Sequence, residues 1–299
     1  MFNQVTIIGC GLIGSSILRC LKKNGSIKKL ISFDNDRAVN DVIKKENLSH
    51  EIASSPSEAV KNSDLVLIST PLSSFESVIN SIKDNLKSGS ILTDTCSVKK
   101  GINEIAKKII SKNTIWIPGH PVAGTENSGP RAGFADLFRD RWTIITPDEN
   151  IKDSDIKKIT FFWESMGSKV KIMPADDHDK ILSLTSHLPH VIAYNIVKTA
   201  MGDDEKTKND IIRYSAGGLR DFTRIAASDP GMWKDIFIDN SSLIIDAIDK
   251  FSNSLNDFKK AITEKDSKKL LEIFEKSKEF RKSIIEAGQD TDKPDFGRK

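Results

Sequence analysis

A glycine-rich loop near the start of the chain constrains the fold more than any other feature of the sequence. Gly9, Gly11 and Gly14 form a G-x-G-x-x-G run. It directly follows the apolar residues 5–8 and opens an amphipathic stretch over residues 12–24. Glycines permit a tight turn, and the N-terminus of the following helix offers free N–H groups and a partial positive charge to an anion. The order of strand, glycine turn and helix therefore predicts a phosphate-binding βα unit.

The first half of the chain alternates short β-branched stretches with longer amphipathic ones. This alternation is typical of βαβ units on a parallel sheet. The predicted helices include residues 12–24, residues 75–86 and one that begins near Asp153. The predicted strands cover residues 5–9, 29–34, 65–70, 90–95, 114–118, 142–146 and 169–173. We therefore expect an α/β fold that begins with a Rossmann-like dinucleotide-binding domain over residues 1–173.

From residue 174 onward the β character disappears, and the apolar residues recur at helical spacing. Pro189 interrupts the first of these helices and should kink or split it. Later helices are predicted over residues 241–262 and 268–287. Their apolar stripes suggest surface buried between two subunits, although an internal core would give the same pattern. We expect an all-helical dimerisation domain over residues 174–299, with a tail from residue 288 that has little to bury.

Composition excludes several classes of partner and site. The 45 Lys and Arg residues are scattered and nearly balanced by 42 Asp and Glu residues, so nucleic acid is not an expected partner. No apolar run approaches the roughly 20 residues that span a bilayer, and no targeting segment is evident, so we expect no membrane association and a cytoplasmic location. The cysteines Cys10, Cys20 and Cys96 have no CxxC spacing, which favours reduced packing residues and no metal site.

An acidic residue at the end of the second predicted strand points to the cofactor. Asp34 lies twenty residues after Gly14, where a carboxylate can accept hydrogen bonds from ribose hydroxyls. A carboxylate there repels a 2′-phosphate, so the cofactor is predicted to be NAD. Arg37 leaves NADP or dual use open, and Asp34 could instead be a turn residue. The predicted cofactor-binding residues from this pattern are Gly9, Gly11, Leu12, Ile13, Gly14 and Asp34, with Ser69, Thr70 and Pro71 at the carboxyl end of a neighbouring strand.

Four further segments carry polar residues that suit chemistry. The segment GHPVAGTE, residues 119–126, follows a predicted strand, which should place His120 at the carboxyl edge of the sheet. A lone histidine there is more often structural than catalytic. The neighbouring segments favour a catalytic role for His120, because DTCSVK at residues 94–99 ends the adjoining strand. The distal half adds SHLPH at residues 186–190 and GGLRDFTRIA at residues 217–226.

Together these segments resemble the TyrA family of prephenate and arogenate dehydrogenases, over residues 5 to about 237. The resemblance implies a Rossmann-like domain followed by a helical domain that makes a homodimer. It implies NAD-dependent oxidative decarboxylation of prephenate, arogenate or both, on the route to tyrosine. It also implies a catalytic pair, His120 as the base and Ser97 as the group that holds the substrate hydroxyl, with Arg224 binding a substrate carboxylate. The other implied site residues are His190, Trp233, Gly217 and Asp221 around the substrate, and Glu126 near the cofactor and His120.

These implied roles suit the chemistry. Prephenate has a ring hydroxyl, a hydride to lose from the same carbon, and a carboxylate that leaves as carbon dioxide when the ring becomes aromatic. The reaction needs a hydride acceptor, a base for the hydroxyl proton and a cation for the anionic substrate. A neutral imidazole suits the base, and the planar fork of arginine suits a carboxylate. Because aromatisation supplies the driving force, no metal is expected.

Several alternatives remain open at this point. A 3-hydroxyacid dehydrogenase or an imine reductase would share the glycine loop, and a non-catalytic NAD-binding sensor would have no need of His120 beside Ser97. His178 lies in the run DDHD and is expected to be a solvated helix start, with its role open. His187 and His190 share a helix face and could be capping or core residues. The choice between prephenate and arogenate is not predicted.

Overall fold

The computed structural model describes residues 2–201 and 204–289. Within these residues, six strands form one fully parallel sheet with the order β3-β2-β1-β4-β5-β6. Its strands are β1 (Gln4–Ile8), β2 (Lys29–Phe33), β3 (Glu51–Ile52), β4 (Leu65–Ile68), β5 (Ile91–Asp94) and β6 (Ile115–Trp116). The strand order reverses between β1 and β4, and such a reversal opens a crevice at the carboxyl ends of the strands.

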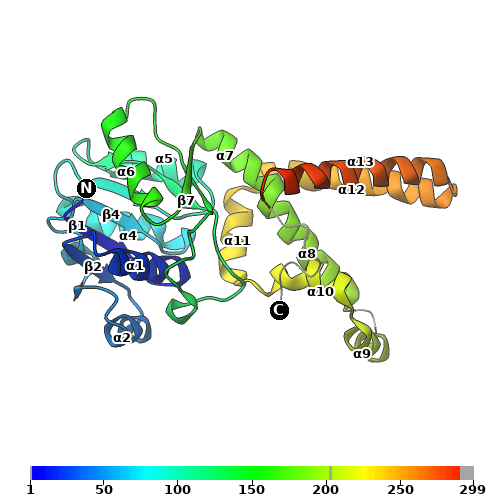
Figure 1. Ribbon diagram of the computed structural model, residues 1–299, viewed down its shortest axis with the longest axis horizontal. Helices are drawn as coiled ribbons and strands as arrows, with labels where there is room; N and C mark the ends of the chain where they lie inside the picture. Colours follow the sequence, from blue (N-terminus) through cyan, green and yellow to red (C-terminus); the bar gives the residue numbers. More distant parts are fainter. Residues whose placement is uncertain (1, 202–203, 290–299) are drawn as a thin grey trace. The chain divides into compact units, whose positions relative to one another are not determined.

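Helices cover both faces of this sheet (Figure 1). Successive strand residues point to opposite faces, and both faces are apolar here. On one face α1 (Leu12–Asn24) and α6 (Asp153–Glu164) pack on Val5, Ile7 and Leu67. On the other, α4 (Phe75–Ile82) and α5 (Lys100–Ile109) pack on Ile8, Val66 and Leu92. The shorter elements of this region are α2 (Arg37–Lys45), α3 (Pro56–Ala59) and the 3-10 turns η1 (Leu72–Ser74), η2 (Lys83–Asn85) and η3 (Pro130–Ala132).

A second, three-stranded sheet follows the parallel one. It contains β7 (Gly119–Pro121), β8 (Trp142–Ile145) and β9 (Lys169–Ile172) in that order. β7 pairs antiparallel with β8, and β8 pairs parallel with β9. The predicted strands at residues 142–146 and 169–173 therefore exist, but they do not extend the parallel sheet. They pair with each other, and β8 also pairs with the short strand β7, which puts His120 opposite Ile144.

From Ala175 onward the described chain is helical. Helix α7 (Ala175–Leu182) continues through a π-helical turn, η4 (Ser183–His187), into α8 (Leu188–Ala200). Pro189 lies at the start of α8, so the predicted interruption of this helix is confirmed. Proline lacks the N–H that an unbroken helix would need. Next come α9 (Glu205–Tyr214), α10 (Gly217–Thr223), the 3-10 turn η5 (Arg224–Ala227) and α11 (Pro230–Asp239).

Two long helices, α12 (Ser241–Thr263) and α13 (Ser267–Glu286), end the described chain. The structure divides into two compact units, one ending at Ile244 and one beginning at Ile245. Helices α7 to α11 therefore share a unit with both sheets, and α12 runs from one unit into the other. The domain boundary predicted at residues 173 and 174 marks where the strands end, and as a domain boundary it stays a prediction. Most of the predicted tail, from residue 290, lies outside the described residues.

Two further expectations concern the cysteines and the membrane. Cys10, Cys20 and Cys96 are all free and buried, as packing residues should be. Burial raises the pKa of the Cys10 thiol well above its usual range, so it stays protonated. Among residues 2–201 and 204–289, no helix combines the length and the apolar character that crossing a membrane requires.

Candidate active site

The three glycines of the loop after β1 serve two different purposes. Gly9 has a φ of +86°, and a Cβ there would lie 2.5 Å from the carbonyl oxygen of Ser69. A Cβ on Gly14 would lie 2.0 Å from the oxygen of Gly9. At Gly11, by contrast, a Cβ would meet nothing within 4 Å. Gly9 and Gly14 are thus required by packing, whereas Gly11 leaves open space at the uncapped N-terminus of α1, where a diphosphate would fit.

Asp34, directly after β2, holds the glycine loop. Its Oδ2 accepts a hydrogen bond from the backbone N–H of Cys10 at 2.7 Å, and its Oδ1 accepts one from that of Asp36 at 2.9 Å. The second bond is the turn contact of the alternative interpretation. Both oxygens keep further acceptor capacity, so the same carboxylate can also bind ribose hydroxyls.

The exits of β4 and β5 lie beside this loop. Ser69 and Thr70 follow β4, and the Thr70 Oγ1 is buried with no partner in the described chain. Pro71, after Thr70, is exposed. The hydroxyl of Thr95, after β5, donates to the hydroxyl of Ser69 at 3.1 Å. The orphaned hydroxyl of Thr70, next to the reversal between β1 and β4, fits a polar ligand.

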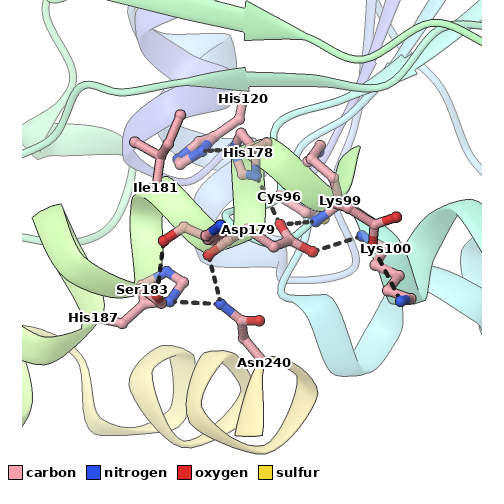
Figure 2. A network of polar contacts seen from close by, with 12 residues as sticks. Cys96, Lys99, Lys100, His120, His178, Asp179, Ile181, Ser183, His187 and Asn240 are labelled. Carbon is pink, nitrogen blue, oxygen red and sulfur yellow. Dashed lines mark hydrogen bonds and ion pairs between the residues drawn. The ribbon is translucent and has the colours of Figure 1, made fainter. Parts of the chain in front are cut away.

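His120 lies on β7 with only 8% of its surface exposed. Its Nδ1 is 2.8 Å from the Nε2 of His178, and the Nδ1 of His178 is 2.7 Å from the Oδ1 of Asp179 (Figure 2). His178 and Asp179 are almost wholly buried. The expectation that His178 is a solvated helix start is therefore wrong. It is the middle member of a row that joins His120 to a carboxylate.

This row fixes which nitrogen of His120 carries the proton. An ionised carboxylate only accepts, so His178 donates from its Nδ1 and its Nε2 is a free acceptor. His120 then donates from its own Nδ1, which leaves the lone pair on Nε2. We assign this tautomer from the hydrogen-bond network. A neutral imidazole with a free lone pair is a base.

The pKa shifts of the three groups agree with this assignment. Burial holds the pKa of His120 well below its usual value, and His178, Lys99 and His187 lower it further. Burial also lowers the pKa of His178, against the opposing effect of Asp179. Burial acts to raise the pKa of Asp179, but the bonds from His178 and from two backbone N–H groups outweigh it, and the net shift is downward. The row is thus two neutral imidazoles and one carboxylate.

The backbone holds Asp179 in place. The N–H groups of Lys99 and Lys100, where α5 begins, each donate to its carboxylate at 2.9 Å. The side-chain Nδ2 of Asn240 donates to the backbone carbonyl oxygen of Asp179. It also lies 3.1 Å from the Nδ1 of His187 (Figure 2). Burial lowers the pKa of His187 to about 4. His187 therefore belongs to the same buried cluster.

The distal helices bring an aromatic stack and a cation to this region. The rings of His190 and Trp233 stack with centroids 3.5 Å apart, and the ring of Trp233 also lies edge-on to His187. Arg224 Nη1 lies 3.3 Å from Glu126 Oε2, and both side chains are partly exposed. An exposed ion pair of this kind contributes little free energy, so the guanidinium can exchange partners with an incoming carboxylate.

Three predicted residues, Ser97, Gly217 and Asp221, lie outside the row behind His120. Ser97 is half-buried on the segment after β5, and within the described chain no hydrogen bond joins it to His120. Gly217 and Asp221 lie on α10, which packs against α8 and η5. A Cβ on Gly217 would meet nothing within 4 Å.

Sequence reasoning left out Asp179 and Lys99. One signal was available for Asp179: it lies three residues before Leu182, so the two side chains share a helix face, and the apolar leucine marks that face as one that packs inward. For Lys99 no comparable signal exists, because nothing in the sequence distinguishes a buried lysine from an exposed one.

The glycine-rich loop at the strand-order reversal and the neutral histidine next to the carboxyl end of β5 fit a nicotinamide-dependent dehydrogenase. Comparison with known families narrows this class. Residues 17–172 match the nucleotide-binding domain of prephenate dehydrogenase, and residues 174–276 match its dimerization domain. The chain therefore belongs to the prephenate dehydrogenase family, and the predicted family and fold class are confirmed.

Individual relatives agree. A cyclohexadienyl dehydrogenase from Zymomonas mobilis is 38% identical over 284 residues, which covers 95% of this chain and 97% of the relative. A prephenate dehydrogenase from Bacillus subtilis is 28% identical over 95% of this chain and 76% of its own length. The crystal structure of the A. aeolicus prephenate dehydrogenase with hydroxyphenyl propionate and NAD+ superposes with a TM-score of 0.87, at 30% identity, over 95% of this chain and 99% of that one.

The fold alone would not have separated the alternatives. A 3-hydroxyisobutyrate dehydrogenase from Mycobacterium tuberculosis, 13% identical, shares the fold with a TM-score of 0.54. The family matches distinguish these classes, and they do not favour a 3-hydroxyacid dehydrogenase, an imine reductase or a non-catalytic sensor.

Proposed function

We propose that this NAD-dependent dehydrogenase carries out the oxidative decarboxylation of prephenate, arogenate or both, as a step in tyrosine biosynthesis. The observation that carries the proposal is the buried row His120–His178–Asp179, which places the proton of His120 on Nδ1 and leaves the Nε2 lone pair free for a substrate. A hydride-transfer site that oxidises an alcohol needs such a base.

The chemistry begins at the ring hydroxyl of the substrate. His120 Nε2 takes the hydroxyl proton while Ser97 holds the oxygen, and the carbon–oxygen bond gains double-bond character as the hydride leaves the same carbon. Bound NAD supplies the hydride acceptor. The ring carboxylate then departs as carbon dioxide, and its bonding electrons make the ring aromatic and return charge to the oxygen. His120 gives the proton back to that oxygen, so the base is restored.

The row behind His120 assists while the proton is held. A protonated His120 is a buried cation, which is costly without a partner. The carboxylate of Asp179, acting through the imidazole of His178, offsets that charge. The same carboxylate sets the tautomer before the reaction, so the lone pair faces the substrate in each cycle.

The substrate is an anion, and the distal helices supply its binding groups. Arg224 binds a carboxylate with its guanidinium fork once it leaves Glu126. His190, held by its stack on Trp233 and by a 2.8 Å contact of its Nδ1 with the oxygen of Ser186, helps to place the side chain. Gly217 and Asp221, both on α10, are the further residues proposed to contact the substrate.

NAD would bind at the reversal between β1 and β4. Gly11, with Leu12 and Ile13 in the first turn of α1, would hold its diphosphate, and Asp34 would accept hydrogen bonds from its ribose hydroxyls. Ser69, Thr70 and Pro71 would hold the cofactor from the exit of β4, and Glu126 is the residue proposed for its nicotinamide end.

The protein acts as a homodimer in the cytoplasm. Large apolar side chains on the two terminal helices are more than half exposed, including Leu255, Leu271 and Phe280. Partner helices that bury these side chains would gain hydrophobic free energy. The match of residues 174–276 to a dimerization domain supports this assembly, which sedimentation velocity tests.

One panel of assays tests the proposed function. Purified protein is supplied with prephenate or arogenate, each with NAD or NADP, and NADH or NADPH formation is followed by absorbance. We expect reduction of NAD with at least one of the two substrates and slower reduction of NADP. A 3-hydroxy acid serves as the control substrate. Turnover of the 3-hydroxy acid with neither prephenate nor arogenate accepted would contradict the proposal.

A further inference from the structure

The segment between β5 and α5 holds a charged residue that the mechanism above does not use. Lys99 has none of its surface exposed, and neither has its partner Asp94. The Nζ of Lys99 donates to the carboxylate of Asp94 and, at 2.6 Å, to the carbonyl oxygen of Gly119. A wholly buried ion pair is costly to assemble, and an apolar pair of the same volume often stabilises a fold as well. Stability alone therefore gives a weak reason for this pair.

The partners of the pair flank the two residues assigned to catalysis. Asp94 accepts from the backbone N–H of Gly119 at 3.1 Å, so the ion pair holds both ends of the residue before His120. Asp94 also accepts from the N–H of Cys96 at 2.8 Å, and Cys96 directly precedes Ser97. The pair thus joins the segment that carries Ser97 to the strand that carries His120.

Lys99 reaches the third part of the site through its backbone. Its N–H donates to the Asp179 carboxylate, which ends the row behind His120 (Figure 2). One residue therefore bonds to the end of β5, to the strand β7 of the second sheet and to the helix α7. Among the hydrogen bonds of the described residues, no other residue joins all three.

We propose that Lys99, paired with Asp94, is a positioning residue that holds Ser97, His120 and Asp179 in their working arrangement across the two sheets and α7. The proposal rests on the proposed function, since it assumes that these three residues act together. Contacts at both ends of Gly119 leave the strand little freedom to shift, and small displacements of reacting groups are costly in rate.

The ammonium group of Lys99 also affects the protonation of His120. The groups around His120 that carry or can carry charge are Asp94 at the end of β5, Lys99 before α5, His178 and Asp179 on α7, and His187 before α8. After burial and His178, Lys99 contributes to lowering the pKa of His120. A base must be neutral to work, so removal of this positive charge should shift the acid limb of the pH–rate profile to higher pH.

The test uses two variants and a matched control. Lys99→Met removes the charge but leaves Asp94 buried without its partner, which can unfold the chain. Asp94→Asn/Lys99→Met removes both charges and avoids that cost. The control is Lys107→Met, because Lys107 lies on α5, which Lys99 directly precedes, but is exposed and pairs with Asp148 at 2.8 Å. Each protein is measured for NAD affinity, for kcat and KM against pH, and for the titration of its histidines by nitrogen-15 NMR.

We expect the double variant to bind NAD within about twofold of the wild type and to lose about 10- to 100-fold in kcat. We expect the His120 titration in Lys99→Met, if that variant folds, to move to higher pH. Lys107→Met should behave as the wild type in every measurement.

A double variant that is less stable but keeps the wild-type kcat would overturn the proposal, because the pair would then be structural only. The NMR titration needs no turnover. If the wild type oxidises neither substrate, the proposed function fails, and the positions of the histidine resonances in wild type and double variant still decide whether the pair arranges this cluster.

Discussion

A single imidazole nitrogen carries the chemistry proposed for this protein. The Nε2 of His120 is a base only because His178 and Asp179 place the proton on the other nitrogen. The two imidazoles and the carboxylate come from β7 and α7, 58 residues apart in the chain. No local sequence motif could therefore have revealed this row.

The tautomer can be tested by replacing the carboxylate. An amide in Asp179→Asn has one acceptor and one donor in place of two acceptors, so it no longer imposes the order of protons along the row. We expect kcat to fall by at least about 100-fold, with NAD affinity unchanged. Asp239→Asn is the control, because Asp239 ends the neighbouring helix α11 but lies outside the row. Equal effects of both replacements would contradict the assigned tautomer.

A second residue-scale prediction concerns the substrate anion. Arg224→Ala removes the guanidinium proposed to bind a carboxylate, and a charge-assisted hydrogen bond contributes about 1.5–3 kcal/mol. We expect KM for the substrate to rise by about 10- to 100-fold while kcat changes little. Arg213→Ala, on α9, serves as the control. If KM is unchanged in Arg224→Ala, the anion is bound elsewhere.

Residue types predicted the site in part. The sequence predicted Asp34 at the end of the second strand, and the structure has it directly after β2. It predicted His120 beyond the strand at residues 114–118, and the structure has it on the additional short strand β7. It misjudged His178, because two exposed aspartates beside it made the run look solvated. Burial of a polar side chain depends on a partner that supplies its hydrogen bonds. Here that partner is distant in the chain, so the burial could not be predicted.

At the scale of elements, the glycine loop offers a paired test of structure against binding. Gly14→Ala would put a Cβ 2.0 Å from the backbone oxygen of Gly9, so we expect a marked loss of thermal stability. Gly11→Ala meets free space in the chain itself and should keep the stability of the wild type while it weakens NAD binding. Differential scanning calorimetry and NAD titration distinguish the two effects. A stable Gly14→Ala with unaltered NAD affinity would mean that this loop is not packed as described.

The helices and the longer strands were predictable because each is long enough to show its period. The helix α1 covers the predicted residues 12–24. The strand β7, with three residues that include Pro121, has no detectable alternation. Its antiparallel pairing with β8 depends on tertiary contacts, which explains why the second sheet was not anticipated.

At the scale of the whole molecule, the buried neutral histidines should make stability depend on pH. The pKa of His187 is lowered to about 4, and those of His120 and His178 are also lowered. Below the unfolded value of about 6.5 the unfolded chain binds more protons than the folded one, so stability present above that pH is lost as the pH falls.

We expect the free energy of unfolding to decrease by about 2 kcal/mol from His187 alone between about pH 7.5 and about pH 5. His187→Asn should flatten this dependence, because an amide does not titrate. Denaturant unfolding at several pH values measures both. Stability that is constant over this interval would show that the histidines are not buried in the neutral form.

The base in the proposed reaction can be tested most directly by a single replacement. His120→Asn is compared with the wild type for NADH formation and carbon dioxide release from prephenate or arogenate, together with the Kd for NAD. We predict that both products form at rates at least about 100-fold lower, while the Kd for NAD stays nearly unchanged. Near-normal turnover in this variant would contradict the account, because the proton would then leave the substrate by another route.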